Sequence, residues 1–92
     1  MNMENEGCYR YMEGSIDIYL GTLLNVAYKD LNEKSRKFIF SMYEHLKICG
    51  QCRDDYIETK RDFASNTAYT EMYPPKSFRL LKENEACLEK SV

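Results

Sequence analysis

The feature that most constrains the fold of this 92-residue chain is a His-x3-Cys-x2-Cys run formed by His45, Cys49 and Cys52. Residues four apart on a helix lie on the same face, about 6 Å apart along its axis. A helix that ends near Cys49 therefore brings the imidazole and the first thiol close together. We expect Gly50 to break this helix, so that a tight two-residue turn returns Cys52 to the same point.

One nitrogen and two sulfur donors that converge in this way are typical of a zinc site. Zinc takes such ligands in tetrahedral geometry at about 2.0–2.3 Å, and a structural site needs a fourth donor. Cys8 is the favoured candidate, because it lies just before the first expected helix and would hold that helix against the turn. Cys87, a water molecule or a carboxylate such as that of Asp54 are the alternatives.

The same residues allow two other interpretations. Four cysteines in this chain are also compatible with small buried apolar side chains that bind nothing. The segment Cys49-Gly50-Gln51-Cys52 also matches dithiol redox motifs, whose first cysteine lies at the N-terminus of a helix. Such motifs normally follow a strand, whereas a long helical pattern precedes Cys49, so the metal site is the favoured interpretation.

Size and charge limit the classes of protein to consider. A chain of 10.9 kDa with 43% apolar residues is expected to form one soluble domain with a thin core. Thirteen Lys and Arg residues against fifteen Asp and Glu residues give a net charge of −2. The chain therefore has no basic excess with which to neutralise phosphates, and nucleic acid is not the expected partner.

The sequence also indicates a compartment and a broad functional class. No apolar stretch is long enough to span a bilayer, and residues 1–7 lack the features of a secretory signal. We therefore expect a cytoplasmic protein, in whose reducing surroundings cysteines act as ligands or redox thiols. An enzyme is not expected, because there is no glycine-rich phosphate loop and the one histidine belongs to the His-x3-Cys-x2-Cys run.

Four helices and no strand are predicted, which assigns the chain to the all-α class. Apolar residues recur at steps of three and four along the expected helices, which cover residues 15–31, 33–48, 52–63 and 75–89. Ser15 and Asn32 are the expected N-caps of the first two. Gly21 is expected to mark a close helix crossing, and Pro75 to occupy the first position of the last helix.

The predicted organisation is one domain overall with a detached C-terminal helix. Residues 1–63 form the zinc-binding helical region, residues 64–77 a linker, and residues 78–92 a helix that binds a partner. The linker contains Pro74-Pro75, which restricts the backbone and marks a hinge. The expected fold is thus a small three-helix unit crosslinked by zinc, plus the C-terminal helix.

The segment from His45 to Arg53 resembles the motif of the zinc-binding anti-sigma factor family, which reads His-Leu-x-x-Cys-x-x-Cys-Arg. The family pattern of an N-terminal Cys or His, a helix, a turn and a second helix also fits, over about residues 8 to 60. The residues that carry the resemblance are Cys8, Tyr19-Leu20, Asn32-Glu33-Lys34 and His45-Leu46-Lys47-Ile48-Cys49-Gly50-Gln51-Cys52-Arg53.

This resemblance implies a ligand set and a function. The zinc ligands would be Cys8, His45, Cys49 and Cys52. The chain would be a soluble, cytoplasmic anti-sigma factor that regulates transcription by occluding a sigma factor. Some soluble relatives release their partner when their thiols are oxidised, so a redox response is part of this expectation.

The resemblance also implies a docking role for the last helix, which in the family wraps around the sigma factor. Phe78, Leu81 and Leu88 are the expected docking residues. A zinc-stabilised helical module that binds another protein or nucleic acid is the alternative function. A CxxC dithiol oxidoreductase is the third.

Overall fold

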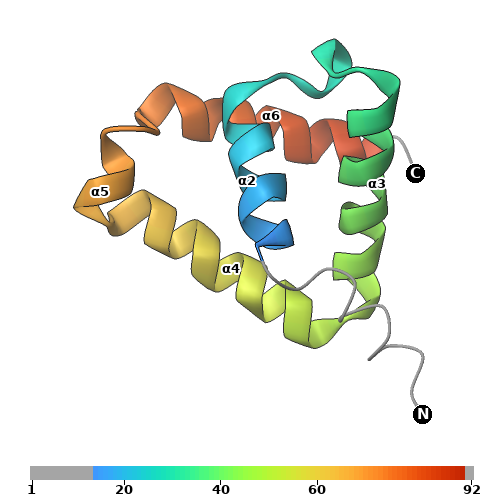
Figure 1. The fold of residues 1–92 in the computed structure, drawn as a ribbon, viewed down its shortest axis with the longest axis horizontal. Coiled ribbons are helices and arrows are strands. Elements are labelled where there is room, and N and C mark those ends of the chain that lie inside the picture. The colour runs from blue at the N-terminus through green and yellow to red at the C-terminus, as the bar shows by residue number, and fades with distance from the viewer. Residues whose placement is uncertain (1–13, 91–92) are drawn as a thin grey trace.

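The computed structural model describes residues 14–90, and these contain helices but no strand, which confirms the all-α class. The elements are α2 (Ser15–Asn25), the 3-10 turn η1 (Tyr28–Asp30), α3 (Glu33–Ile48), α4 (Gly50–Ser65), α5 (Thr67–Thr70) and α6 (Pro75–Lys90). Helices α3, α4 and α6 surround α2, and the short α5 joins α4 to α6 (Figure 1). Between residues 14 and 90, no helix combines the length and apolar character needed to cross a membrane.

The N-caps of α3 and α2 are set by the residues that precede each helix. The side chain of Asn32 accepts a hydrogen bond from the Ser35 amide at 2.8 Å, which confirms Asn32 as the N-cap of α3. The N-cap of α2 is Gly14 rather than the predicted Ser15. Gly14 has φ of 87°, a left-handed conformation that glycine adopts without the steric cost of a Cβ atom.

The first helix is shorter than predicted. It ends at Asn25 instead of continuing to Leu31, because Val26 turns to an extended conformation with φ of −134°. The side chain of Asn84 on α6 binds the backbone at this end, through the carbonyls of Leu23 and Val26. These bonds satisfy carbonyls that a helix terminus leaves without partners.

The core lies between α2 and the three long helices around it. Leucine is its most frequent member, and aromatic side chains pack at its edge. The seven large side chains with the least exposure are Tyr19, Leu20, Leu23, Leu24, Ile39, Met42 and Leu88.

The prediction of a detached last helix is wrong. Helix α6 packs along α2, and Leu81 and Leu88 belong to the core with 2% and 0% of their surface exposed. Phe78 is half-buried at the edge of that core. The apolar stripe that was expected to await a partner is instead covered by the chain's own helices, because burial of that stripe stabilises a small domain.

The segment between α4 and α6 is also more ordered than a linker. It contains α5, and the ring of Phe63 stacks on Tyr69 and Tyr73 with centroid separations of 4.2 and 5.3 Å. A Cβ atom added to Gly21 would lie 3.3 Å from the Tyr73 hydroxyl. The close approach predicted at Gly21 is therefore made by the side chain of Tyr73, which lies outside the helices.

Candidate metal centre

The corner between α3 and α4 is built on one extended residue. Cys49 has φ of −111° and ψ of 104°, so the break lies at Cys49, and Gly50 is already the first residue of α4. The Cys49 amide donates to the His45 carbonyl at 2.9 Å, and its carbonyl accepts from the Arg53 amide at 3.0 Å. The predicted two-residue turn at Gly50 is therefore wrong, because Cys49 alone ends one helix and begins the next.

Arg53 on α4 also stabilises this corner, through bonds to the end of α3. Its guanidinium donates to the carbonyl of Leu46 at 3.0 Å and to that of Lys47 at 2.5 Å. Carbonyls in the last turn of a helix lack partners within the helix, and a cationic donor there interacts favourably with the helix dipole. Arg53 thus caps α3 while belonging to α4, and this role was missed at the sequence level, where Arg53 entered only as part of a motif.

Three donor side chains meet at the corner. His45, Cys49 and Cys52 are exposed by only 7%, 4% and 4%, and their ligand atoms all lie within 4.8 Å of one another. The Nε2 atom of His45 lies 3.2 Å from the Sγ atom of Cys52. The structure therefore brings together the three residues of the His-x3-Cys-x2-Cys run.

The chemistry of this group fits a metal ion. Ligands bound at about 2.0–2.3 Å in a tetrahedron lie roughly 3.5 Å from one another, close to the observed separation between His45 and Cys52. An imidazole nitrogen and two sulfurs favour zinc and other thiophilic metals over cations that prefer oxygen. His45, Cys49 and Cys52 could thus hold a metal ion.

The fourth donor remains a prediction. Cys8 lies outside the described residues. The two protein alternatives, Cys87 on α6 and the exposed Asp54 on α4, do not belong to the group of His45, Cys49 and Cys52.

The corner also bears on the dithiol interpretation. Cys49 is the N-cap of α4, which is where the attacking cysteine of a dithiol motif lies. Its side chain is buried, as is that of Cys52, and no strand occurs between residues 14 and 90. The burial of both sulfurs beside an imidazole favours a metal site over a site that must admit a disulfide substrate.

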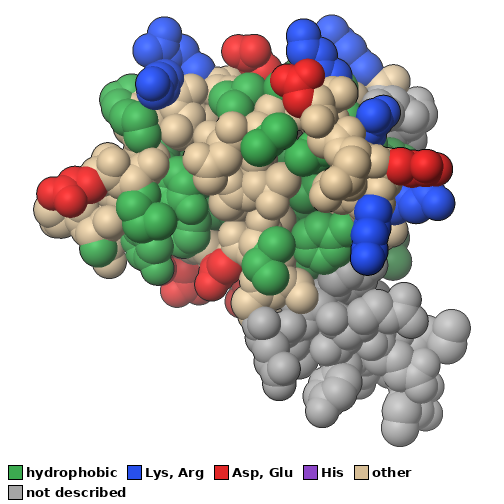
Figure 2. Space-filling view, turned by 45° about the horizontal axis from the view of Figure 1, so that its top comes forward, with side chains coloured by type: hydrophobic (Ala, Val, Ile, Leu, Met, Phe, Trp, Pro, Cys, Tyr) green, Lys and Arg blue, Asp and Glu red, His purple; other side chains and the backbone are tan. Residues whose placement is uncertain are grey.

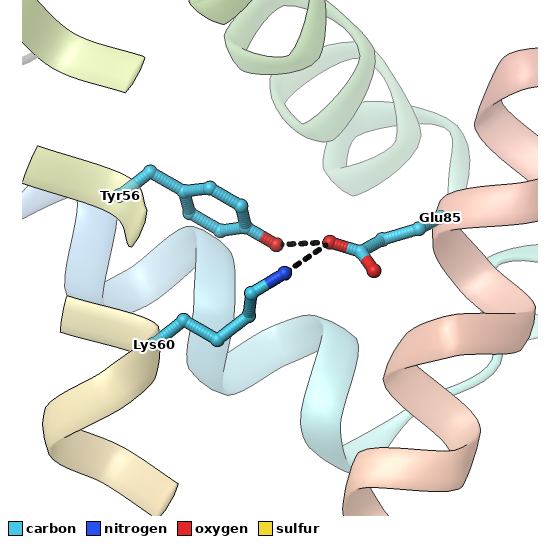
Figure 3. A network of polar contacts seen from close by, with 3 residues as sticks. All are labelled: Tyr56, Lys60 and Glu85. Atoms are coloured by element: carbon cyan, nitrogen blue, oxygen red, sulfur yellow. Dashed lines mark hydrogen bonds and ion pairs between the residues drawn. The ribbon is translucent and has the colours of Figure 1, made fainter. Parts of the chain in front are cut away.

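A polar network beside the corner was not predicted from the sequence. The Tyr56 hydroxyl donates to a carboxylate oxygen of Glu85 at 2.5 Å, and the Lys60 ammonium lies 3.2 Å from the same oxygen (Figure 3). Burial, followed by the bond to Glu85, raises the pKa of Tyr56 well above its ordinary value. Burial raises the pKa of Tyr19 too, whose ring meets Tyr56 edge to face. This network joins α4 to α6.

Comparison with known proteins adds no assignment to these observations. No family model matches the chain, and neither a curated protein nor a solved structure matches it.

Proposed function

We propose that this chain is a zinc-binding, anti-sigma-like regulator that sequesters a sigma factor by occlusion. The observation that carries the zinc part is the burial of an imidazole and two thiols whose ligand atoms lie within 4.8 Å of one another. The sigma-factor part is supported by the resemblance of the segment from His45 to Arg53 to the family motif.

In this proposal, His45, Cys49 and Cys52 bind zinc, with Cys8 as the fourth ligand. Bound zinc would supply a crosslink across the corner between α3 and α4. Such a crosslink suits a chain of 92 residues, because a domain of this size buries a small core and metal binding adds directly to its folding free energy.

The surface favours a protein partner over nucleic acid. The net charge is −2, so an extended field that attracts phosphates is not expected. Ile18, Ile48 and Met72 each expose more than half of their surface. In Figure 2, hydrophobic side chains reach the surface at several separate places on the face shown, and charged side chains lie mostly around its edge. Exposed large apolar side chains are more typical of protein interaction surfaces than of nucleic-acid interfaces, which are rich in Lys and Arg.

The packing of α6 changes the proposed mode of binding. Leu81 and Leu88 are buried among the chain's own helices, so they stabilise the fold instead of reaching out to a partner. Only Phe78, among the three expected docking residues, keeps a substantial exposed surface. We therefore propose that the partner binds the folded globule with α6 in place.

The expected redox response belongs to the same proposal. Hydrogen peroxide would take two electrons from the thiolates of Cys49 and Cys52, forming a disulfide between them and two hydroxide ions. The disulfide removes two of the donors from the group of His45, Cys49 and Cys52, and the corner loses its crosslink. The partner would then be released as the corner loosens.

The metal content of the full chain tests the zinc part. Protein purified under reducing conditions should contain about one equivalent of zinc, and Cys52→Ser should lose most of it. Less than a third of an equivalent would contradict the proposal. Cys8→Ser and Cys87→Ser form a matched pair that identifies the fourth ligand, since we expect only the first to weaken zinc binding.

Capture from the native host tests the sigma-factor part. The tagged, zinc-loaded chain should retain a sigma factor or RNA polymerase, and peroxide should release it. Absence of any transcription protein would contradict the proposal. Retardation of DNA in a gel at low salt, lost steeply as salt is raised, would instead favour the nucleic-acid alternative.

A further inference from the structure

Helices α4 and α6 border a groove of about 330 Å³. Both walls repeat with the spacing i, i+3, i+4, i+7, so each helix presents one face to the groove. The α4 wall consists of Ile57, Lys60, Arg61 and Ala64, and the α6 wall of Phe78, Leu81, Lys82 and Glu85. The two helices are linked at one end of the groove through Glu85, which binds Tyr56 and Lys60 (Figure 3).

The apolar part of the groove is accessible. Ile57 exposes 43% of its surface, although it is a large aliphatic side chain. Phe78 is half-buried, and Leu81 lies at the bottom, where it joins the core. Ile57 and Phe78 thus form a hydrophobic surface that a partner's side chains can cover, with a gain of about 25 cal/mol for each Å² of apolar area removed from water.

The charges around this surface are mainly positive. Lys60 is engaged with the Glu85 carboxylate, whereas neither Arg61 nor Lys82 has an ion-pair partner among residues 14–90. The other acidic residues of the two helices lie outside the groove lining. They include Glu58, Asp62 and Glu83. The groove therefore combines an apolar floor with a lining that carries three cations and one carboxylate, within a protein of net negative charge.

We propose that this groove docks an acidic amphipathic helix of a protein partner. Its apolar face would cover Ile57 and Phe78, and its carboxylates would pair with Arg61 and Lys82. This inference rests on the proposed function, for which it supplies the docking surface and the chemistry of the partner segment.

The helical form of the occupant follows from the walls. A helix that lies along a groove between two other helices packs its own side chains at i, i+3, i+4 and i+7 between theirs. The volume of about 330 Å³ is near the lower limit of roughly 300–1,000 Å³ for small-molecule pockets. A groove this small and open to solvent suits a few anchoring side chains of a longer segment.

A synthetic peptide tests the proposal directly. The probe is an amphipathic peptide of about 18 residues, roughly five helical turns, with leucines on one face and glutamates elsewhere. Fluorescence anisotropy with the full, zinc-loaded chain measures its affinity, and circular dichroism measures its helicity on binding. A peptide of the same composition in scrambled order, and one with lysine in place of glutamate, should bind at least tenfold more weakly.

Variants of exposed residues test the assignment to this groove. Arg61→Glu combined with Lys82→Glu should weaken peptide binding roughly tenfold, because two attractive pairs become repulsive. Lys29→Glu combined with Lys34→Glu is the matched control, since it changes the net charge equally at exposed sites outside the groove. Ile57→Ser tests the floor independently of charge and should also weaken binding. Thermal unfolding confirms that each variant is folded.

Three outcomes would overturn the proposal. Equal binding of the ordered and scrambled peptides would show that no helix is recognised. An equal loss of peptide affinity in the groove variant and in the control variant would show that only the net charge of the protein matters. Concentration-dependent dimerisation that Ile57→Ser abolishes, or tighter binding by a peptide of residues 1–13, would assign the groove to this chain itself.

The failure of this inference can be separated from failure of the proposed function. Undiminished capture of a sigma factor by the Arg61→Glu, Lys82→Glu variant would disprove the groove as docking site and leave the function intact. Peptide binding that depends on the groove, without capture of any transcription protein, would disprove the function and leave the docking chemistry intact.

Discussion

Two junctions in this molecule are closed by buried polar side chains, and they differ in what those side chains bind. At the junction of α2 and α6, Asn84 accepts from the Tyr28 amide at 2.9 Å and donates to the carbonyls of Leu23 and Val26 at 2.8 and 2.9 Å. At the corner of α3 and α4, the polar atoms are the donors of His45, Cys49 and Cys52, which face one another.

Because of this difference, we call the α2–α6 junction permanent, since its partners all belong to the chain, and the α3–α4 corner conditional, since its donors can also bind an ion. Every hydrogen-bonding atom of the Asn84 amide group has a backbone partner, so the α2–α6 junction needs nothing from outside the chain. The α3–α4 corner carries donors that an ion or an oxidant can engage. We therefore expect the stability that the corner contributes to depend on the presence of metal and oxidant. The stability that the α2–α6 junction contributes should be independent of both.

The largest expected effect comes from removing a donor at the corner. Cys52→Ser should lower the free energy of unfolding in the presence of zinc by several kcal/mol, because metal binding contributes directly to folding. Chemical denaturation with and without zinc measures the change. In metal-free protein the same substitution should cost much less. Equal stability of the two proteins in zinc would contradict the conditional character of the corner.

The second largest expected effect concerns Asn84 at the permanent α2–α6 junction. Asn84→Ala should lower the free energy of unfolding by about 3 kcal/mol, because it leaves two backbone carbonyls and one amide without their partner. The loss should be the same with and without zinc. The control is Asn25→Ala, which removes an exposed side-chain bond to Gly21 and should cost less than about 0.5 kcal/mol. If the loss of unfolding free energy in Asn84→Ala depended on zinc, the distinction between the permanent junction and the conditional corner would be wrong.

The third effect concerns Tyr56, which connects α4 to α6 through Glu85. Tyr56→Phe should cost about 1.5 kcal/mol near neutral pH, since it removes a half-buried hydrogen bond to a charged group. The raised pKa of Tyr56 means that the folded state holds this proton more tightly than the unfolded state. Its contribution is thus complete below about pH 10, the pKa of unfolded tyrosine, and is lost as the pH rises further.

Denaturation at several pH values checks this sign. Stability of the unsubstituted chain should fall as the pH rises above about 10, and Tyr56→Phe should make that fall shallower. Tyr19, whose pKa is also raised by burial, accounts for part of the remaining slope. A steeper alkaline loss in Tyr56→Phe than in the unsubstituted chain would contradict the assignment.

The smallest effect gives a reference outside both junctions. Asn32→Ala removes the N-cap bond of α3 and should cost about 1 kcal/mol, independent of zinc and of alkaline pH. Neighbouring Glu33 and Lys37 form an exposed pair, so Glu33→Ala should cost less than about 0.5 kcal/mol. If Asn32→Ala costs no more than Glu33→Ala, local capping does not contribute to this helix as proposed.

The parts of the fold that local chemistry determines could be predicted from the sequence. The bounds of α3 follow from the Asn32 cap and the apolar stripe, and both were predicted. The proximity of His45 and Cys49 was predicted from helical spacing, and that of Cys52 from a turn at Gly50; the three donors do lie together. The exact position of the break was missed, since Cys49 takes the extended conformation without help from a glycine.

The parts that depend on distant residues could not be predicted in the same way. An amphipathic stripe shows that α6 buries one face, but it does not say whether a partner or the chain itself covers that face. One signal was present, because Asn84 stands in the stripe between Leu81 and Leu88. A buried amide requires specific partners, and the backbone end of α2 supplies them.

The bonds of Asn84 also have a consequence for the order of events during synthesis. They join positions that lie 56, 58 and 61 residues apart, and the later partner is always on α6. While a ribosome is still making α5, the end of α2 has no amide to bind and Leu88 is missing from the core. The nascent chain can form local helices early, but its packed state waits until nearly the last turn of α6 has been made.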